Sequence, residues 1–128
     1  MIGQVESGSF PDESLPVDMA VMRRMFHDNP ALVRKFALKF IAVATDTLVE
    51  MKAAQAGKNA SVLGRLGHKL KSSARTIGAS GFADLCEALE EAGTDNNWPS
   101  AESLMADIPF LLERITQQLE KEFSNMNE

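Results

Sequence analysis

Apolar residues recur at three- and four-residue spacing along most of the chain, which is the period of an amphipathic α-helix. Four long segments carry this pattern, over about residues 30–56, 60–77, 80–92 and 99–123, and a short one over 18–27 precedes them. No segment alternates in the manner of a β-strand. Short loops between amphipathic helices make neighbours antiparallel, so the pattern predicts an all-α fold. The expected architecture is an antiparallel up-and-down four-helix bundle with a short additional N-terminal helix.

Capping and breaking residues set the expected ends of these helices. Asn29 followed by Pro30 is a strong start signal, because asparagine caps a helix and proline suits its first turn. The other expected caps are Asp18, Asn59 or Ser61, and Ser80. The glycines expected to follow helix ends are Gly57, Gly78 and Gly93. Pro109 is expected to kink the last helix, since it removes one backbone hydrogen bond.

The ordered bundle is expected over residues 17–124. Residues 1–16 combine glycine, proline and acidic residues and are expected to be a disordered lead-in, and residues 125–128 a frayed C-terminus. The apolar stripe of the segment over 30–56, expected to face the core, consists of Val33, Phe36, Phe40, Ala44, Thr47, Leu48 and Met51.

Composition limits the class of protein. The chain has 128 residues, 45% of them hydrophobic, as in an ordinary globular domain. Its single cysteine, Cys86, excludes an internal disulfide and a multi-cysteine zinc site. No segment is apolar enough to span a membrane, and the first fifteen residues do not resemble a signal peptide. We therefore expect a cytoplasmic monomer that binds no membrane and, at a net charge of −5, no nucleic acid.

The positive charge is concentrated in one segment. Residues 51–83 contain no aspartate or glutamate and six basic residues, which are Lys52, Lys58, Arg65, Lys69, Lys71 and Arg75. The rest of the chain holds seven basic and 18 acidic residues, a net charge of −11. A compact cationic patch on an acidic protein indicates a specific anionic partner or ligand.

His68 lies in this segment, and helical geometry turns it outward. At 100° per residue, Leu66 and Leu70 lie about 160° from His68 around the helix axis, so the apolar face and the histidine point in opposite directions. Three cations share the face of the histidine: Arg65, Lys71 and Arg75. The sequence therefore predicts an exposed imidazole among positive charges.

The residues around the histidine suit phosphoryl chemistry. A neutral imidazole nitrogen is a nucleophile, and an ordinary histidine pKa of about 6.5 leaves most rings neutral at cytoplasmic pH. Lys71 and its neighbours can neutralise the oxygens of a phosphoryl group on the ring. Gly64, Gly67 and Ser72 are small and are expected to clear space for a docking partner, although the glycines can also serve close helix packing.

The segment HKLKSSARTIGASGFADLCEALE resembles the histidine-containing phosphotransfer (HPt) domain of multistep two-component signalling. The family pattern is a histidine, a lysine three residues on, a small residue four residues on, a glycine about ten residues on, and a second helix of the L-x-x-L/C-x-x-L-E/Q type. The matching positions are His68, Lys71, Ser72, Gly78 and the stretch 85–90. The resemblance extends over about residues 17–121.

The resemblance implies a role for each matching residue. His68 would accept the phosphoryl group through Nε2, and Lys71 would stabilise it. Ser72 takes the small-residue position, commonly glycine, where a receiver domain approaches. Glu90 falls where the family often has glutamine, and its carboxylate would hold Nδ1–H of the imidazole. The other expected partner contacts are Gly64, Arg65, Gly67, Lys69 and Arg75.

The implied function is a carrier that reversibly shuttles a phosphoryl group between aspartates of response-regulator receiver domains, including that of a hybrid sensor kinase. No kinase activity is expected, since the sequence holds neither G-x-x-x-x-G-K-[ST] nor G-x-G-x-x-G. We expect no cofactor in this chain, because the Mg²⁺ needed for transfer would belong to the receiver.

The residues beside the two histidines disfavour two other functions. A carboxylate-bridged metal bundle needs Glu-x-x-His on two helices, but arginine stands three residues before both His27 and His68. The phosphoacceptor helix of a sensor kinase usually has an acidic residue after its histidine, whereas Lys69 follows here. A helical interaction module that binds an anionic partner without phosphotransfer is the alternative that stays open.

Overall fold

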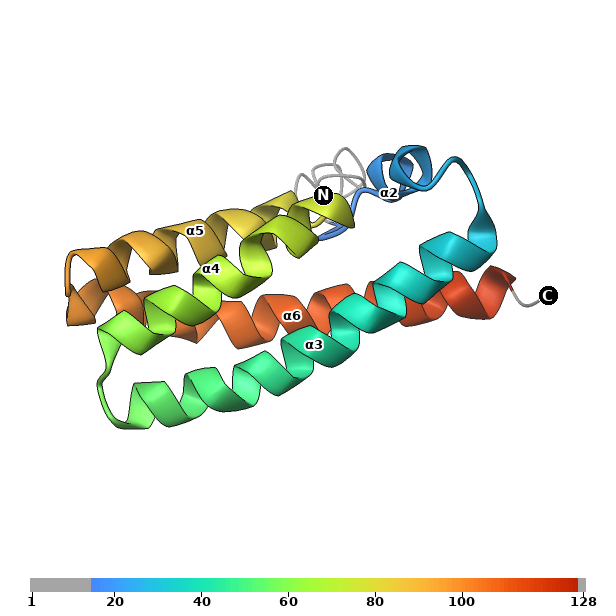
Figure 1. The fold of residues 1–128 in the computed structure, drawn as a ribbon. Coiled ribbons are helices and arrows are strands. Elements are labelled where there is room, and N and C mark those ends of the chain that lie inside the picture. The colour runs from blue at the N-terminus through green and yellow to red at the C-terminus, as the bar shows by residue number, and fades with distance from the viewer. Residues whose placement is uncertain (1–14, 127–128) are drawn as a thin grey trace, which may run out of the picture.

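The helices of the computed structural model follow the predicted order, and the model describes residues 15–126. They are α2 (Met19–Met25), α3 (Pro30–Ala56), α4 (Ala60–Thr76), α5 (Ser80–Thr94) and α6 (Trp98–Met126). In Figure 1, α3 to α6 lie along one long axis with alternating direction, and α2 sits at the end where α3 begins. No strand occurs within residues 15–126. The predicted bundle with its extra N-terminal helix is confirmed.

The ends of the chain lie mostly outside the described residues. Of the expected disordered lead-in over 1–16, only residues 15 and 16 are described, and of the expected frayed end over 125–128, only 125 and 126, which continue α6. α6 also continues through Pro109 as one helix. Over residues 15–126, no helix is both long and apolar enough to pass through a bilayer.

Side-chain caps form where asparagine and aspartate were expected to provide them. Asn29 Oδ1 accepts hydrogen bonds from the backbone N–H groups of Ala31 and Leu32, at 3.0 and 3.2 Å. Asp18 and Asn59 cap α2 and α4 in the same way. These bonds satisfy amide groups that a helix start leaves without partners.

The predicted cap at Ser80 is wrong. Ala79 precedes α5 without a side-chain hydrogen bond, and Ser80 is the first residue of the helix. The reason is the turn before it: Gly78 takes a positive φ of 84°, and its carbonyl accepts a hydrogen bond of 2.9 Å from the backbone N–H of Asp18. This contact with the N-terminal segment holds the turn in place. α5 therefore begins at Ser80 itself, one residue before the start that a cap at Ser80 would give.

The core follows the predicted stripes with one correction on α3. Val33, Phe40, Ala44, Thr47 and Met51 are buried and Leu48 is half-buried. Phe36 was expected in the core, but it is 37% exposed and stacks against Phe26 of the α2–α3 turn, with 4.7 Å between ring centroids. Ala37 is buried instead, because α3 is rotated slightly from the orientation expected from the larger side chains.

Helices α4 and α5 pack against each other through glycine. A Cβ atom on Gly67 would lie 2.6 Å from the backbone oxygen of Cys86, and one on Gly93 would lie 2.8 Å from that of Ala60. Real Cβ atoms do not approach backbone oxygens so closely, so only glycine permits this helix separation. The close approach brings side chains of α5 within reach of those on α4.

Of the two uses expected for the glycines, close helix packing is the one that Gly67 serves. Gly64 and Gly67 are both buried, and their missing side chains leave room for the α5 backbone. Cys86, on the same contact, is fully buried, and burial raises the pKa of its thiol to about 12. It is an unreactive core residue.

Candidate functional site

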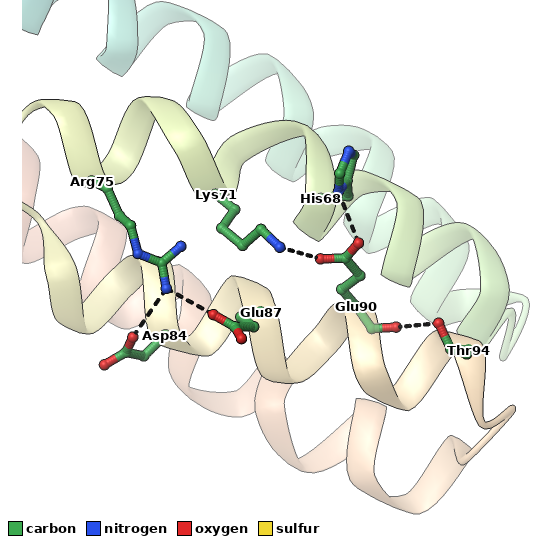
Figure 2. A network of polar contacts seen from close by, with 7 residues as sticks. All are labelled: His68, Lys71, Arg75, Asp84, Glu87, Glu90 and Thr94. Carbon is green, nitrogen blue, oxygen red and sulfur yellow. Dashed lines mark hydrogen bonds and ion pairs between the residues drawn. The ribbon is translucent and has the colours of Figure 1, made fainter.

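His68 stands on the outer face of α4, as predicted. Its side chain is 68% exposed, while Leu63, Leu66 and Leu70 of the same helix are buried in the core. The packing of α4 therefore does not depend on the imidazole, which is presented to solvent by a well-buried helix. Figure 2 shows this side chain with its neighbours on α4 and α5.

Glu90 reaches from α5 to two side chains of α4. Its Oε2 lies 2.8 Å from His68 Nδ1, and its Oε1 accepts a 2.7 Å hydrogen bond from Lys71 Nζ. Figure 2 shows the carboxylate between the imidazole and the ammonium group. Thr94, one turn on, donates to the backbone oxygen of Glu90 at 3.2 Å. The structure thus brings together the three residues to which the sequence assigned the chemistry.

The charge state of Glu90 settles which ring nitrogen carries the proton. The hydrogen bond from Lys71, followed by that from His68, lowers the pKa of the Glu90 carboxyl below its ordinary value, although desolvation opposes them. An ionised carboxylate offers only acceptors, so Nδ1 of His68 is the donor. In the neutral ring, Nε2 then holds the lone pair, and it points away from Glu90 in Figure 2. A nucleophilic nitrogen faces solvent.

Two further cations of α4, Lys69 and Arg75, are paired with carboxylates. Arg75 lies 2.7 Å from Glu87 and 3.5 Å from Asp84, both on α5. Lys69 lies 3.8 Å from Glu50 on α3. Half of the six cations of the acid-free segment, namely Lys69, Lys71 and Arg75, thus have carboxylate partners on α3 or α5. A count of charges along the segment leaves out the acids of the helices packed beside it.

The residues assigned to partner binding divide into two groups. Arg65, Lys69, Ser72 and Arg75 are exposed on α4. Gly64 and Gly67 are buried against α5, as described above. The exposed members lie on the side of α4 that carries His68 or beside it, where a docking protein can reach them.

A pocket of about 450 Å³ opens beside the imidazole. Its lining residues are Ser61, Gly64, Arg65, His68, Glu90, Gly93 and Thr94. Sequence reasoning missed Ser61, Gly93 and Thr94; the spacing of Thr94, four residues after Glu90, would have placed it on the same face of α5. Among the described residues, no group of three or more histidine, cysteine, aspartate or glutamate side chains is placed to hold a metal ion.

Replacing Lys71 with alanine is expected to raise the pKa of Glu90 towards its ordinary value, because the hydrogen bond from Lys71 is the main cause of the lowered pKa. A ¹³C NMR titration of the Glu90 carboxyl measures this. Lys69→Ala is the matched control, since Lys69 pairs with Glu50 instead. An unchanged Glu90 pKa in Lys71→Ala, or equal shifts in both variants, would contradict the observed pairing.

Comparisons with known proteins show the family and the fold of the chain. The family model of the Hpt domain matches residues 35–126. The chain belongs to the Hpt domain family. A crystal structure of histidine-containing phosphotransfer protein B (HptB) from Pseudomonas aeruginosa PAO1 superposes on this Hpt domain with a TM-score of 0.79. The identity is 18%, over 86% of this chain and 96% of that one, so the likeness shows a shared fold. No curated protein sequence matches the chain.

Family membership places the chain in the histidine phosphotransfer family of two-component phosphorelays. Proteins of the family interact with response-regulator receiver domains and with kinases. The resemblance that the residues around His68 suggested is confirmed at the level of the family.

Proposed function

We propose that this Hpt domain carries a phosphoryl group on Nε2 of His68 and passes it reversibly between aspartates of receiver domains. The observation that supports this most directly is the hydrogen bond between Glu90 and Nδ1, which leaves Nε2 as an exposed nucleophile. The donor would be the receiver of a hybrid sensor kinase and the acceptor that of a response regulator. We expect the protein to act as a cytoplasmic monomer.

The transfer step follows from this arrangement. The Nε2 lone pair attacks the phosphorus of an aspartyl phosphate, a P–N bond forms, the P–O bond breaks, and the aspartate leaves as a carboxylate. The ring keeps its Nδ1 proton and becomes positively charged. The Glu90 carboxylate, 2.8 Å from that nitrogen, stabilises the charge. The reverse attack by a second aspartate releases the neutral ring, so no proton has to be exchanged with solvent.

Lys71 has the donors to assist this step without leaving Glu90. An ammonium group has three N–H donors, and one of them is used in the 2.7 Å bond to Oε1. The other two can donate to phosphoryl oxygens. Glu90 holds the lysine beside the imidazole, which reduces the conformational entropy lost when the phosphoryl group arrives.

A docking receiver would cover the exposed face of α4. Ser72, one turn after His68, is small and exposed, so it allows close approach to the ring. Lys69 and Arg75 flank this face and would contact the acidic surroundings of a receiver aspartate, partly in exchange for their present carboxylates. The magnesium ion of the reaction would be bound by the receiver.

Phosphotransfer from labelled receivers tests the proposal. The purified protein is incubated with a panel of receiver domains carrying ³²P-aspartyl phosphate, and the label on the protein is followed. We expect acid-labile, base-stable label that returns to an unlabelled receiver. Binding to receivers without any transfer of label, across the panel, would reject the shuttle and support an interaction module.

A further inference from the structure

Arg65 differs from the other cations of α4. Within residues 15–126, Lys69, Lys71 and Arg75 each pair with at least one carboxylate, whereas Arg65 makes no ion pair. Its contact is with the hydroxyl of Ser61, at 3.5 Å, the outer limit for a hydrogen bond. Such a contact costs little to break, so the guanidinium is available to another partner.

The position of Arg65 is also suited to an anion held by the histidine. Arg65 and His68 line the same pocket of about 450 Å³. Residues three apart on a helix are neighbours, with Cβ atoms about 5–6 Å apart. The long side chain of an exposed arginine reaches a group attached to an imidazole at that separation.

Charge explains why a further cation is needed beside the histidine. A phosphoryl group on a side chain carries about −1.5 to −2 charges near neutral pH. On the phosphorylated ring, the positive charges of the imidazolium and of Lys71 are opposed by the single negative charge of Glu90, which contacts both. About one net positive charge is left, less than the phosphoryl group carries, and Arg65 is a cation of the pocket that has no carboxylate partner among the described residues.

We propose that Arg65 is a second phosphoryl-binding residue, whose guanidinium leaves Ser61 and donates to the oxygens of the group on Nε2 of His68. This inference rests on the proposed function. The guanidinium fits two phosphoryl oxygens with parallel N–H donors, which a lysine does not. Lys71 then binds the group from the α5 side, and Arg65 binds it from the turn of α4 that precedes His68.

The test uses the phosphorylated protein without any receiver. In a His27→Asn background, so that His68 is the only histidine, the protein is treated with potassium phosphoramidate. The P–N bond of the reagent breaks, ammonia leaves, and phosphorus bonds to Nε2. The ionisation of the phosphoryl group is then followed by ³¹P NMR as a function of pH for the parent, Arg65→Gln, Arg65→Lys and the control Lys52→Gln.

Arg65→Gln is expected to raise the pKa of the phosphoryl group by about half a unit, because a nearby cation favours the dianion and exposed ion pairs are weak. Arg65→Lys should recover part of that shift. Lys52 is exposed on α3 and does not line the pocket, so Lys52→Gln should have no effect.

The possible results test the role of Arg65 separately from the role of His68 as the phosphoryl acceptor. A titration of Arg65→Gln identical to that of the parent, or equal shifts in Arg65→Gln and Lys52→Gln, would overturn it. Weaker receiver binding with an unchanged titration would also overturn it, since Arg65 would then be a docking contact only. Absence of phosphohistidine in every protein would instead count against His68 as the nucleophile.

Discussion

His68→Gln is expected to abolish phosphorylation by any receiver while leaving the bundle folded. A glutamine amide nitrogen has no available lone pair, so the P–N bond of the carrier cannot form. The side chain at this position is 68% exposed and is not part of the buried core, so the loss of the ring costs little stability. The measurement is transfer of ³²P from a receiver, accompanied by thermal unfolding of both proteins.

His27 provides the matched control for this substitution. It is the second histidine of the chain, is exposed at the turn after α2, and has a positive φ of 57°, which asparagine tolerates better than most residues. His27→Asn is therefore expected to be labelled as fast as wild type. Label retained on His68→Gln, or lost from His27→Asn, would show that the phosphoryl acceptor has been misassigned.

Gly67→Ala is expected to lower the free energy of unfolding by about 1–3 kcal/mol, the usual cost of an overpacked contact. The new Cβ would lie 2.6 Å from the backbone oxygen of Cys86, and a backbone atom cannot move aside as a flexible side chain can. The gain of about 1 kcal/mol in helix propensity is too small to compensate. Separation of α4 from α5 would also move Glu90 away from His68, so transfer is expected to slow as well.

Gly81→Ala tests whether the effect comes from the helix contact. A Cβ atom on Gly81 meets nothing within 4 Å, so this variant is expected to be as stable as wild type or slightly more stable. Urea unfolding of the three proteins gives the comparison. A Gly67→Ala protein as stable as Gly81→Ala would mean that α4 and α5 can separate at little cost, contrary to the packing described here.

Most of the fold could be predicted because its determinants are local. The pair Asn29–Pro30 starts α3 through the backbone of its own first turn, and the leucines of α4 are spaced so that one face is apolar. Ser80 was misassigned because the start of α5 follows a turn at Gly78 that is bonded to Asp18, a residue about 60 positions earlier in the sequence. A hydrogen bond between residues so far apart cannot be predicted from the residues near Ser80 alone.

The site was predicted in part. The outward direction of His68 follows from helical geometry alone, but its contact with Glu90 joins residues 22 positions apart and came only from the resemblance to a family. Spacing along α4 could not show that Arg75 is paired with Glu87, or that Gly67 faces a neighbouring helix. Both depend on the packing of α5.

The Glu90 carboxylate binds two side chains of α4, so mutations in this site cannot be interpreted one residue at a time. Glu90 uses one oxygen for the imidazole and the other for the ammonium group, so a replacement at position 90 disturbs both at once. Changes at Glu90 and Lys71 act on one network, and their effects on transfer will not add. The histidine, the glutamate and the lysine form one functional unit, and no single substitution measures the separate contribution of any member.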